Sequence, residues 1–352
     1  MAREFAIGNR IITEGSPPYV IGEIGNNHQG RVDLCKHLIT AAKRAGCDAV
    51  KLQKRHCQSL FTKKLYDSPY ENDNSFGKTY GEHKEALDFN EDQWFELIKH
   101  AKSEGIFIFS TAFDVFSIDF LVKMGIKAFK VASGDLQNIP LMVHMAKYHL
   151  PVIISTGGGS WADLDRVHAT MELFEAEWCF LHCVASYPNR PEEMNLRAIP
   201  AMMERYPDTI IGLSDHYPGS LMALTAYGLG AQVFERHFTK DKTWKGPDHN
   251  LSCEPWEMEM MIHDMARVRA AMGTPEKRRQ ECEARGLYKM GKSIYAARHI
   301  EVGRTISLGD ICIKSPAEGL SPAEWWNVIG AVARRDVGVD EAITREVIDE
   351  SI

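Results

Sequence analysis

Two histidines lie at the ends of two consecutive apolar segments, where they could share a metal ion. His216 follows the apolar run 209–213, and His237 ends the run Val-Phe-Glu-Arg-His with Glu235 two positions before it. Residues two apart on a strand share a face, so Glu235 and His237 point the same way, as Ser214 and His216 do if that strand continues. Two imidazoles with carboxylates nearby and open coordination positions suit a Lewis-acid divalent cation. The alternative from the pattern alone is that each histidine is a core or rim residue.

Two lysines, Lys51 and Lys130, interrupt apolar runs, where a charge is costly without a partner. A bound phosphate or carboxylate group would supply that partner, and the backbone N–H groups of the glycine turn 157–159 could assist. Hydroxyl side chains that could complete such an anion pocket are those of Thr111, Ser133, Ser155 and Ser214. The alternative is internal pairing, for which the nearby carboxylates are Glu23, Glu235 and Asp215.

These side chains need a scaffold that gathers them, and the spacing of the apolar runs predicts one. Helix-like segments such as 34–45 and 92–102 alternate with short apolar runs typical of parallel strands buried on both faces. The eight runs are 19–22, 49–53, 106–111, 128–132, 152–155, 179–184, 209–213 and 233–237. The alternation predicts an α/β fold, a (β/α)8 TIM barrel, with a doubly wound open sheet as the alternative. In such a barrel, active residues lie at the carboxyl ends of the strands, where the candidates above are found.

A long insertion follows the second apolar run and contains the segment 75–83, SFGKTYGEH. Long loops at a barrel mouth are often lids over the active site. The alternative is a solvent-exposed Ω-loop without a role in the chemistry.

The last part of the chain has a different pattern. Residues 274–286 are charged and nearly free of apolar side chains, which predicts a linker, with a solvated extension of the last barrel helix as the alternative. Beyond them, 293–303 and 329–338 are two related strand–turn segments, each followed by an isoleucine, Ile306 or Ile343. We therefore expect a catalytic barrel over 1–273, a linker over 274–286 and a small β-rich domain over 287–352.

Composition excludes several classes of protein. The net charge of -7 over 352 residues argues against a broad nucleic-acid-binding surface. No run of 18 apolar residues is present, so we expect no membrane span, and the N-terminus has no apolar segment typical of a signal peptide. The eight cysteines form no C-x-x-C pair, which indicates reduced thiols and predicts a cytoplasmic protein.

The ordered motifs along almost the whole chain resemble those of the sialic acid synthase family, which includes N-acetylneuraminate synthases and their legionaminic, pseudaminic and spore-coat relatives. The matching stretches are IGEIGNNHQG (21–30), DAVKLQ (48–53), GKTYGEH (77–83), FSTAFD (109–114), KVASGD (130–135), ISTGGG (154–159), GLSDH (212–216), ERHFTKD (235–241) and GPDHNLSCEP (246–255). The C-terminal domain is similar to the antifreeze-like (SAF) domain of that family.

The resemblance implies roles for residues at matching positions. It implies that His216 and His237 ligate a divalent metal, Mn²⁺ above all, with Mg²⁺ or Co²⁺ as the other candidates. It assigns proton transfer, or orientation of the sugar and water, to Glu23, Glu235 and Asp248. The residues that it implies for substrate binding, around phosphoenolpyruvate above all, are Lys51, Gln53, Thr111, Lys130, Ser133, Ser155, Tyr187 and Ser214.

The reaction that the resemblance implies joins phosphoenolpyruvate to an amino-sugar aldehyde of the N-acetylmannosamine type. C3 of phosphoenolpyruvate attacks the aldehyde, water adds at C2 and phosphate leaves, so the product is a nonulosonic acid. The family also implies a homodimer that exchanges its C-terminal domains. Two other functions remain open: a Schiff-base aldolase that uses Lys51 or Lys130 as its nucleophile, and a non-catalytic sugar-binding protein.

Three positions depart from the pattern of some bacterial members. Ala185 precedes Ser-Tyr-Pro where those members have Asn, and Asp135 replaces a longer Glu. Ser315 stands in the C-terminal domain where those members have an Arg that reaches the sugar from the partner subunit. These departures bear on the identity of the sugar more than on the condensation itself.

Overall fold

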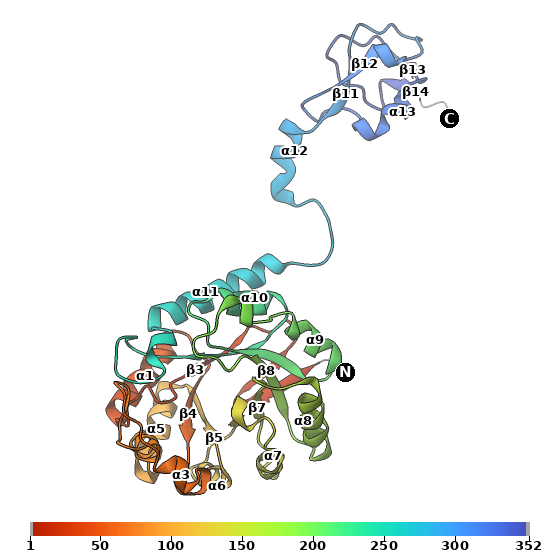
Figure 1. Cartoon of the computed structure of the whole chain (residues 1–352). Coiled ribbons are helices and arrows are strands. Elements are labelled where there is room, and N and C mark those ends of the chain that lie inside the picture. Colours follow the sequence, from red (N-terminus) through yellow and green to blue (C-terminus); the bar gives the residue numbers. More distant parts are fainter. Residues whose placement is uncertain (1–2, 350–352) are drawn as a thin grey trace. The chain divides into compact units, whose positions relative to one another are not determined.

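Eight parallel strands close into a barrel in the structure, a computed structural model that describes residues 3–349 (Figure 1). The strands are β3 (Tyr19–Glu23), β4 (Ala49–Lys54), β5 (Phe107–Ala112), β6 (Phe129–Val131), β7 (Val152–Ser155), β8 (Trp178–Cys183), β9 (Ile210–Asp215) and β10 (Val233–His237). Their order, β10-β3-β4-β5-β6-β7-β8-β9, follows the chain and closes on itself. Every residue of β3, β6, β7, β9 and β10 is buried, as expected for strands covered on both faces. The predicted TIM barrel and its eight strands are confirmed, and the open sheet is excluded.

Helices cover the outside of the barrel (Figure 1). They are α1 (Val32–Arg44), α5 (Glu91–Glu104), α6 (Val115–Lys123), α7 (Ile139–Ala146), α8 (Trp161–Leu173), α9 (Ala198–Arg205), α10 (Leu221–Gly228) and α11 (Pro255–Met272). The apolar spacing explains α1, whose buried side chains recur every three to four residues from Leu34 to Ala42. Side chains start α5 and α8, because Asn90 and Ser160 each accept a hydrogen bond from the backbone three residues on.

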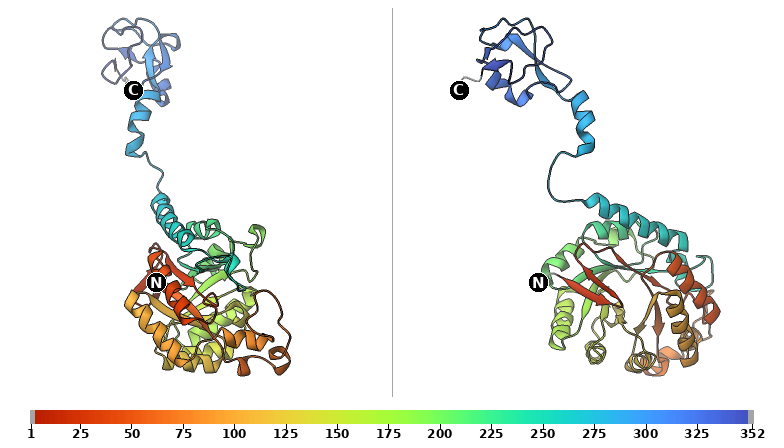
Figure 2. Two further views of the ribbon diagram at one scale, coloured as in Figure 1. Left: turned by 90° about the vertical axis from the view of Figure 1, so that its left-hand side faces the viewer. Right: turned by 180° about the vertical axis from the view of Figure 1, so that it is seen from behind.

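A hairpin of β1 (Glu4–Ile7) and β2 (Arg10–Thr13), which sequence analysis missed, precedes the barrel (Figure 2, red). Arg3 donates to the carbonyl of Pro207, just before β9, and Glu177, just before β8, accepts a hydrogen bond from the hairpin backbone. Gly8, at its turn, lies against the Phe107 ring at the start of β5. The hairpin therefore covers the amino ends of the strands, opposite the end where the candidate residues lie.

The insertion between β4 and α5 contains α2 (Cys57–Leu60), α3 (Lys63–Tyr66) and α4 (Tyr80–Ala86). Thr79 and Glu82 form a capping box that starts α4, and His83 on that helix is fully buried. An ideal Cβ on Gly81 would lie 2.2 Å from the Tyr66 ring, so only glycine allows α3 and α4 to pack this closely. The segment 75–83 is therefore part of a packed helical insertion and not a featureless Ω-loop.

The chain forms two compact units, and the second begins at Thr274. The structure differs from the expected linker over 274–286, because α12 (Ala284–Met290) starts within it. Ala284, Arg285, Leu287, Lys289 and Met290 favour a helix there, and Gly286 within its first turn does not prevent it. The remaining elements of the second unit are β11 (Ser293–Ala296), β12 (Ile311–Lys314), α13 (Trp325–Val328), β13 (Val332–Ala333) and β14 (Ile348–Asp349).

The two related segments of the C-terminal unit meet around one core. An isolated bridge pairs Ile300 with Val337, and a second pairs Thr305 with β13. Ile306 and Ile343, which follow the two segments, are 1% and 0% exposed in the same apolar cluster. The small β-rich domain expected from the sequence is therefore present, with small two-stranded sheets.

A buried carboxylate, Asp310, fixes the turn before β12. It accepts hydrogen bonds from the Ser307 backbone N–H at 2.7 Å and from Arg298 Nε at 2.5 Å, and Arg304 lies 3.2 Å away. Burial opposes its ionisation, but the hydrogen bonds from Ser307 and Arg298 lower the pKa of Asp310 to about 2. The carboxylate is therefore charged at neutral pH and its partners depend on it.

Replacing Asp310 with alanine is expected to destabilise the C-terminal unit by about 1–2 kcal/mol, because the Ser307 backbone N–H and the Arg298 guanidinium lose a charged acceptor. Hydrogen exchange across 293–349 should accelerate in the full-length variant, whereas the barrel should stay protected. The matched control is Glu301→Ala, which removes an exposed carboxylate of the same unit. Equal exchange in the two variants would contradict the role of Asp310.

Within residues 3–349, no helix combines the length and apolar character needed to cross a bilayer. All eight cysteines are free thiols, and six of them are buried.

Candidate functional site

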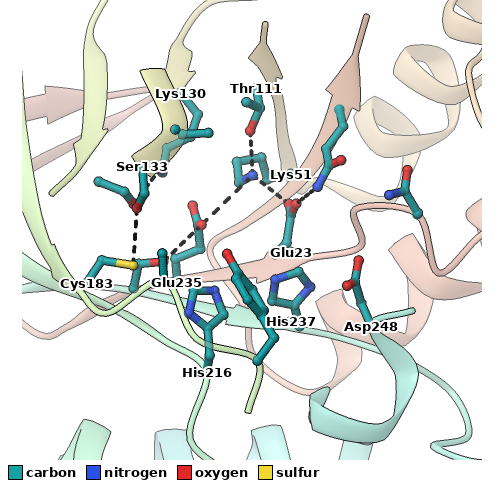
Figure 3. Close-up of a pocket in the computed structure, with 18 of the residues that line it drawn as sticks. Glu23, Lys51, Thr111, Lys130, Ser133, Cys183, His216, Glu235, His237 and Asp248 are labelled. Atoms are coloured by element: carbon teal, nitrogen blue, oxygen red, sulfur yellow. Dashed lines mark hydrogen bonds and ion pairs between the residues drawn. The ribbon is translucent and has the colours of Figure 1, made fainter. Parts of the chain in front are cut away.

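A cavity of about 420 Å³ opens at the carboxyl ends of the barrel strands (Figure 3). Its wall contains every site residue that the sequence indicated. They are Glu23, Lys51, Gln53, Thr111, Lys130, Ser133, Ser155, Tyr187, Ser214, His216, Glu235, His237 and Asp248. Parallel strands bring their carboxyl ends to one edge, which explains how residues from seven strands and from the segments that follow the strands converge.

Lys51, only 3% exposed, lies among carboxylate and hydroxyl groups. Its ammonium donates to Thr111 Oγ1 at 2.6 Å and lies 2.9 Å from Glu23 Oε2 and 3.9 Å from Glu235 Oε1 (Figure 3). Internal pairing, the alternative to an anionic ligand, is thus present for this lysine. Asp215, the third carboxylate considered, instead forms a buried ion pair with Arg236 at 2.5 Å.

Lys130 lies on β6, and its ammonium donates to Ser155 Oγ at 2.6 Å and to the Val131 carbonyl at 2.8 Å. No ion pair with it is found within residues 3–349. Burial lowers the pKa of Lys130, although Glu235 opposes this shift. Burial disfavours the charged form of Glu235 too, but Lys130 and Lys51 hold its pKa below the ordinary value. The floor of the cavity therefore contains two buried lysines beside the ionised carboxylate of Glu235.

Hydroxyl groups line the same side of the cavity. Ser214 donates weakly to Glu235 Oε1 at 3.4 Å, and Ser133 donates to Cys183 Sγ at 3.4 Å. Ser133 also accepts the backbone N–H of Gly157 at 3.1 Å, so this amide is already satisfied. The expectation that the glycine turn 157–159 contributes to the anion pocket is wrong, since the other two glycines line a neighbouring cavity. An ideal Cβ on Gly157 would lie 2.6 Å from Ser133 Oγ, so glycine permits this close packing.

His216 and His237 face one another across the cavity, with ring centroids 5.4 Å apart (Figure 3). His216 Nδ1 lies 3.2 Å from the Val184 carbonyl, which can only accept, so Nδ1 carries the proton and Nε2 has a free lone pair. Burial, and secondarily His237, lower the pKa of His216 to about 3, so its ring is neutral. His237 Nδ1 is buried without a hydrogen-bond partner, and Tyr187 packs on His216 at 4.1 Å between centroids.

The donor set fits a divalent cation with only two protein ligands. Neutral imidazoles with unused lone pairs are ligands for such ions, and His237 Nδ1 is an otherwise unexplained buried polar atom. No group of three or more His, Cys, Asp or Glu suited to a metal occurs in the described part of the chain. Any ion held here by His216 and His237 would therefore keep most of its coordination positions for water and substrate.

Two side chains hold the Glu23 carboxylate in place, one at each oxygen. Gln53 donates to Glu23 Oε1 at 2.7 Å, while Lys51 faces the other oxygen. Asp248 comes from the loop after β10 and lies on the side of the cavity toward Glu23 and His237 (Figure 3). The candidate carboxylates therefore occupy different depths: Glu23 and Glu235 lie beside the lysines, and Asp248 lies on a loop.

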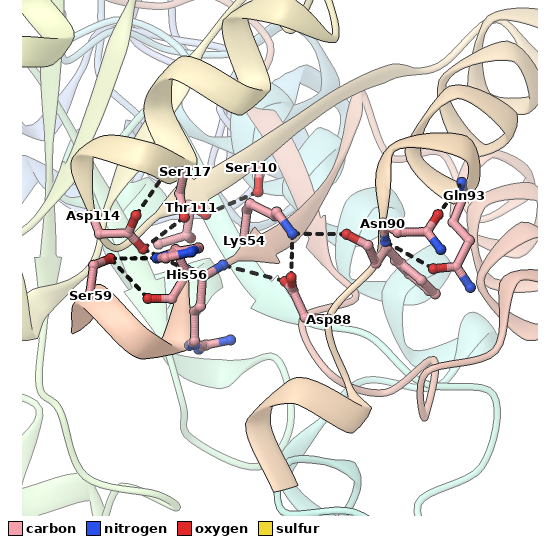
Figure 4. A network of polar contacts seen from close by, with 12 residues as sticks. Lys54, His56, Ser59, Asp88, Asn90, Gln93, Ser110, Thr111, Asp114 and Ser117 are labelled. Carbon is pink, nitrogen blue, oxygen red and sulfur yellow. Dashed lines mark hydrogen bonds and ion pairs between the residues drawn. The ribbon is translucent and has the colours of Figure 1, made fainter. Parts of the chain in front are cut away.

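The wall residues that sequence reasoning missed include Arg55, Lys84, Phe113 and Cys183. Arg55 could have been found, because it follows Gln53 by two positions and shares its face of β4. Its neighbours on the chain are held tightly, since Lys54 pairs with Asp88, and the His56 backbone donates to Asp114 (Figure 4). Lys84 comes from the insertion, whose placement no local pattern reveals.

The three departures from the bacterial pattern have different surroundings. Ala185 lines the cavity, whereas Asp135 accepts a hydrogen bond from Asn138 at 3.0 Å and does not line it. Burial raises the pKa of Asp135. Ser315 accepts a hydrogen bond from Lys292 at 2.6 Å within the C-terminal unit.

Comparisons with known proteins agree with this architecture. Residues 38–277 match the NeuB family, and residues 291–346 match the SAF domain. The chain is 37% identical to the N-acetylneuraminate-9-phosphate synthase of Homo sapiens over 95% of this chain and 93% of that protein. It is 34% identical to the N,N'-diacetyllegionaminic acid synthase of Legionella pneumophila subsp. pneumophila, with 89% of each chain covered.

Solved structures of similar proteins have the same fold. The N-acetylneuraminic acid synthetase of Leptospira borgpetersenii, in complex with citrate, superposes with a TM-score of 0.70 at 29% identity, covering 81% of this chain and 95% of that one. The spore coat polysaccharide biosynthesis protein spsE of Bacillus subtilis superposes with a TM-score of 0.66 at 28% identity, covering 98% and 99%. The barrel, the cavity residues and the SAF domain occur together in one chain. The chain belongs to the NeuB family, the sialic acid synthases.

Proposed function

We propose that the chain condenses phosphoenolpyruvate with an N-acetylmannosamine-type amino sugar to a nonulosonic acid, with release of phosphate. The observation that carries this proposal is the composition of one cavity: two buried lysines with hydroxyl groups on its floor, carboxylates beside them and two histidines whose ring centroids lie 5.4 Å apart. An anion, an electrophilic aldehyde and a water can each find suitable partners there. Names of relatives in the same family support this class of reaction.

The lysines would hold the phosphate and carboxylate groups of phosphoenolpyruvate. Lys130 has hydroxyl and carbonyl partners but no carboxylate within ion-pair distance among residues 3–349, so an incoming anion would supply its missing counter-ion. Ser155 and Thr111, already bonded to the two ammonium groups, would extend the same cradle. Fixed cations in a buried site stabilise an anionic substrate without reorganising during the reaction.

The carboxylates would accept protons and orient the sugar. C3 of phosphoenolpyruvate forms a bond to the aldehyde carbon, whose oxygen takes up a proton, and water adds to C2 before phosphate leaves with its bridging oxygen. Glu235 is ionised, and its Oε2 is buried without a hydrogen-bond partner, so it can accept a proton from the attacking water. Glu23 and Asp248 would orient the sugar, Glu23 being held by Gln53.

His216 and His237 would hold a divalent cation, with Mn²⁺ as our first choice and Mg²⁺ or Co²⁺ as alternatives. When bound, such an ion supplies Lewis-acid polarisation of the aldehyde oxygen. The hydrogen bond from His216 Nδ1 to Val184 fixes the tautomer that presents Nε2 to the cavity. Tyr187 packs on the His216 ring and would help to hold its orientation.

The test is release of inorganic phosphate from phosphoenolpyruvate with a panel of 2-acetamido sugars, in Mn²⁺ and in EDTA. Release that requires both a sugar and the metal is the expected result, with stoichiometric formation of a nonulosonic acid. Folded protein that releases no phosphate with any sugar would contradict the proposal and favour a non-catalytic sugar-binding role.

A Schiff-base aldolase is the second candidate, because burial lowers the pKa of Lys130 and a neutral amine is what such a nucleophile requires. Borohydride added with a 2-keto sugar acid would then attach the substrate to Lys130 or Lys51 and change the mass of that peptide. We expect no such adduct, because Ser155 and the Val131 carbonyl both accept hydrogen bonds from the Lys130 ammonium.

We also propose that the protein is a homodimer that exchanges its C-terminal units. The second unit is small and leaves large apolar side chains exposed, among them Tyr288, Met290 and Trp326 at 54%, 72% and 76%. A partner barrel would cover such side chains. Light scattering at working concentration should give twice the mass of one chain, and a monomer would contradict the proposal.

A further inference from the structure

Arg55 lies in the cavity wall at a higher level than the buried lysines. It continues the face of β4 that presents Lys51 and Gln53, so four residues, about 13 Å of strand, separate it from Lys51. Its guanidinium packs over the Phe113 ring at 4.0 Å and donates to Gln53 Oε1 at 2.5 Å. These contacts fix the orientation of the Arg55 guanidinium, but they use only part of its hydrogen-bonding capacity.

Lys84 reaches the same cavity from α4 of the insertion. Its ammonium lies 5.3 Å from the Tyr80 ring centroid, and no hydrogen bond from it is found in the described chain. Burial and the charge of Arg55 lower the pKa of Lys84 to about 8, while Asp248 opposes the shift. Lys84 is therefore a partly buried cation beside another cation.

Neither cation has a carboxylate within ion-pair distance in the part of the chain that is described. The nearest acidic neighbour of Arg55 on the insertion, Asp88, is instead engaged by Lys54, and it also accepts the Arg55 backbone N–H at 3.3 Å. Two unpaired cations in a cavity wall are costly in the free protein. An anionic group of a ligand would offset that cost.

We propose that Arg55 and Lys84 form a second anion subsite, which selects an amino sugar that carries a phosphate monoester at the end remote from its aldehyde. This inference rests on the function proposed above and specifies its second substrate. A planar guanidinium and an ammonium match a phosphate dianion, since the fork can bind two oxygens while the ammonium neutralises further charge. The sugar would then extend from the histidines toward the insertion.

Arg55 has a second role, because its hydrogen bond holds the Gln53 amide, which in turn donates to Glu23. Loss of Arg55 would therefore disturb both the orientation of Glu23 and the subsite. No hydrogen bond joins Lys84 to Gln53 in the described chain, so a Lys84 variant tests the subsite while the Gln53–Glu23 hydrogen bond stays in place. The two variants together separate a positioning effect from a specificity effect.

The experiment compares N-acetylmannosamine with N-acetylmannosamine 6-phosphate as partners for phosphoenolpyruvate, in the full-length protein with Mn²⁺. The measured quantity is the ratio of kcat/KM for the two sugars, which cancels any general loss of activity. In the unchanged protein this ratio should favour the phosphorylated sugar. Lys84→Gln should lower it about 10- to 100-fold, mainly through the KM of the phosphorylated sugar, as expected for one charge-assisted contact. Arg55→Gln should lower both the ratio and the activity with each sugar.

Lys78→Gln is the matched control, because this exposed lysine of the same insertion lies outside the cavity, and it should leave the ratio unchanged. Thermal midpoints confirm that each variant is folded. Equal use of both sugars by the unchanged protein would overturn the inference and leave the proposed function intact, as would a Lys84→Gln ratio equal to that of the control. If neither sugar causes phosphoenolpyruvate to be consumed, the proposed function and this inference both fail.

Discussion

A Lys51→Met variant is expected to lose about 1000-fold in kcat/KM for phosphoenolpyruvate while remaining folded. Lys51 is the only residue within ion-pair distance of both Glu23 and Glu235 among residues 3–349. Its removal deprives the substrate of a fixed cation and raises the pKa of Glu235, which loses part of its counter-charge. Glu235 can take up a proton, which limits the cost to stability. Methionine preserves the length and apolar part of the side chain, so packing should change little.

Steady-state kinetics of phosphate release and the thermal midpoint measure this prediction. Lys99→Met, on the exposed face of α5, is the control and should behave as the unchanged protein. Phosphoenolpyruvate should also protect the unchanged protein against thermal unfolding, and the Lys51→Met variant much less. A variant that keeps more than about one tenth of the activity would show that Lys51 serves only to pair the carboxylates.

Removing the divalent cation is expected to abolish turnover, with a loss of at least about 1000-fold, while phosphoenolpyruvate still binds. The anion cradle around Lys130 and Ser155 contains neither histidine, so its geometry does not depend on a metal. EDTA treatment followed by Mn²⁺ should restore the rate. A His216→Ala, His237→Ala double variant should show no restoration and no rise of its thermal midpoint in Mn²⁺.

The thermal midpoint is a readout of metal binding that does not require activity, because a ligand that binds only the folded state stabilises it. His263→Ala is the matched control, since this histidine on α11 is 64% exposed and does not line the cavity. Full turnover after exhaustive EDTA treatment would contradict the metal assignment, and so would an unchanged Mn²⁺ effect in the double variant.

The barrel was predictable because its strands have a clear local signal. Strands buried on both faces consist of nearly continuous apolar residues, and β9 and β10 match their predicted runs to within a few residues. The hairpin β1–β2 was missed because its strands have only four residues each and its burial depends on contacts with Pro207 and Phe107, far along the chain. The helix α12 was missed because charged residues dominate the stretch in which it starts.

The sequence by itself determined which side chains face the barrel cavity, because alternation along a strand and the shared carboxyl edge of parallel strands are local rules. Lys51, Glu235 and His237 follow from these rules alone. Only the tertiary structure decided the partners: it paired Asp215 with Arg236, satisfied the Gly157 amide with Ser133 and brought Lys84 into the cavity. Those outcomes depend on how loops and neighbouring strands pack over long sequence separations, and no periodicity within one segment encodes that packing.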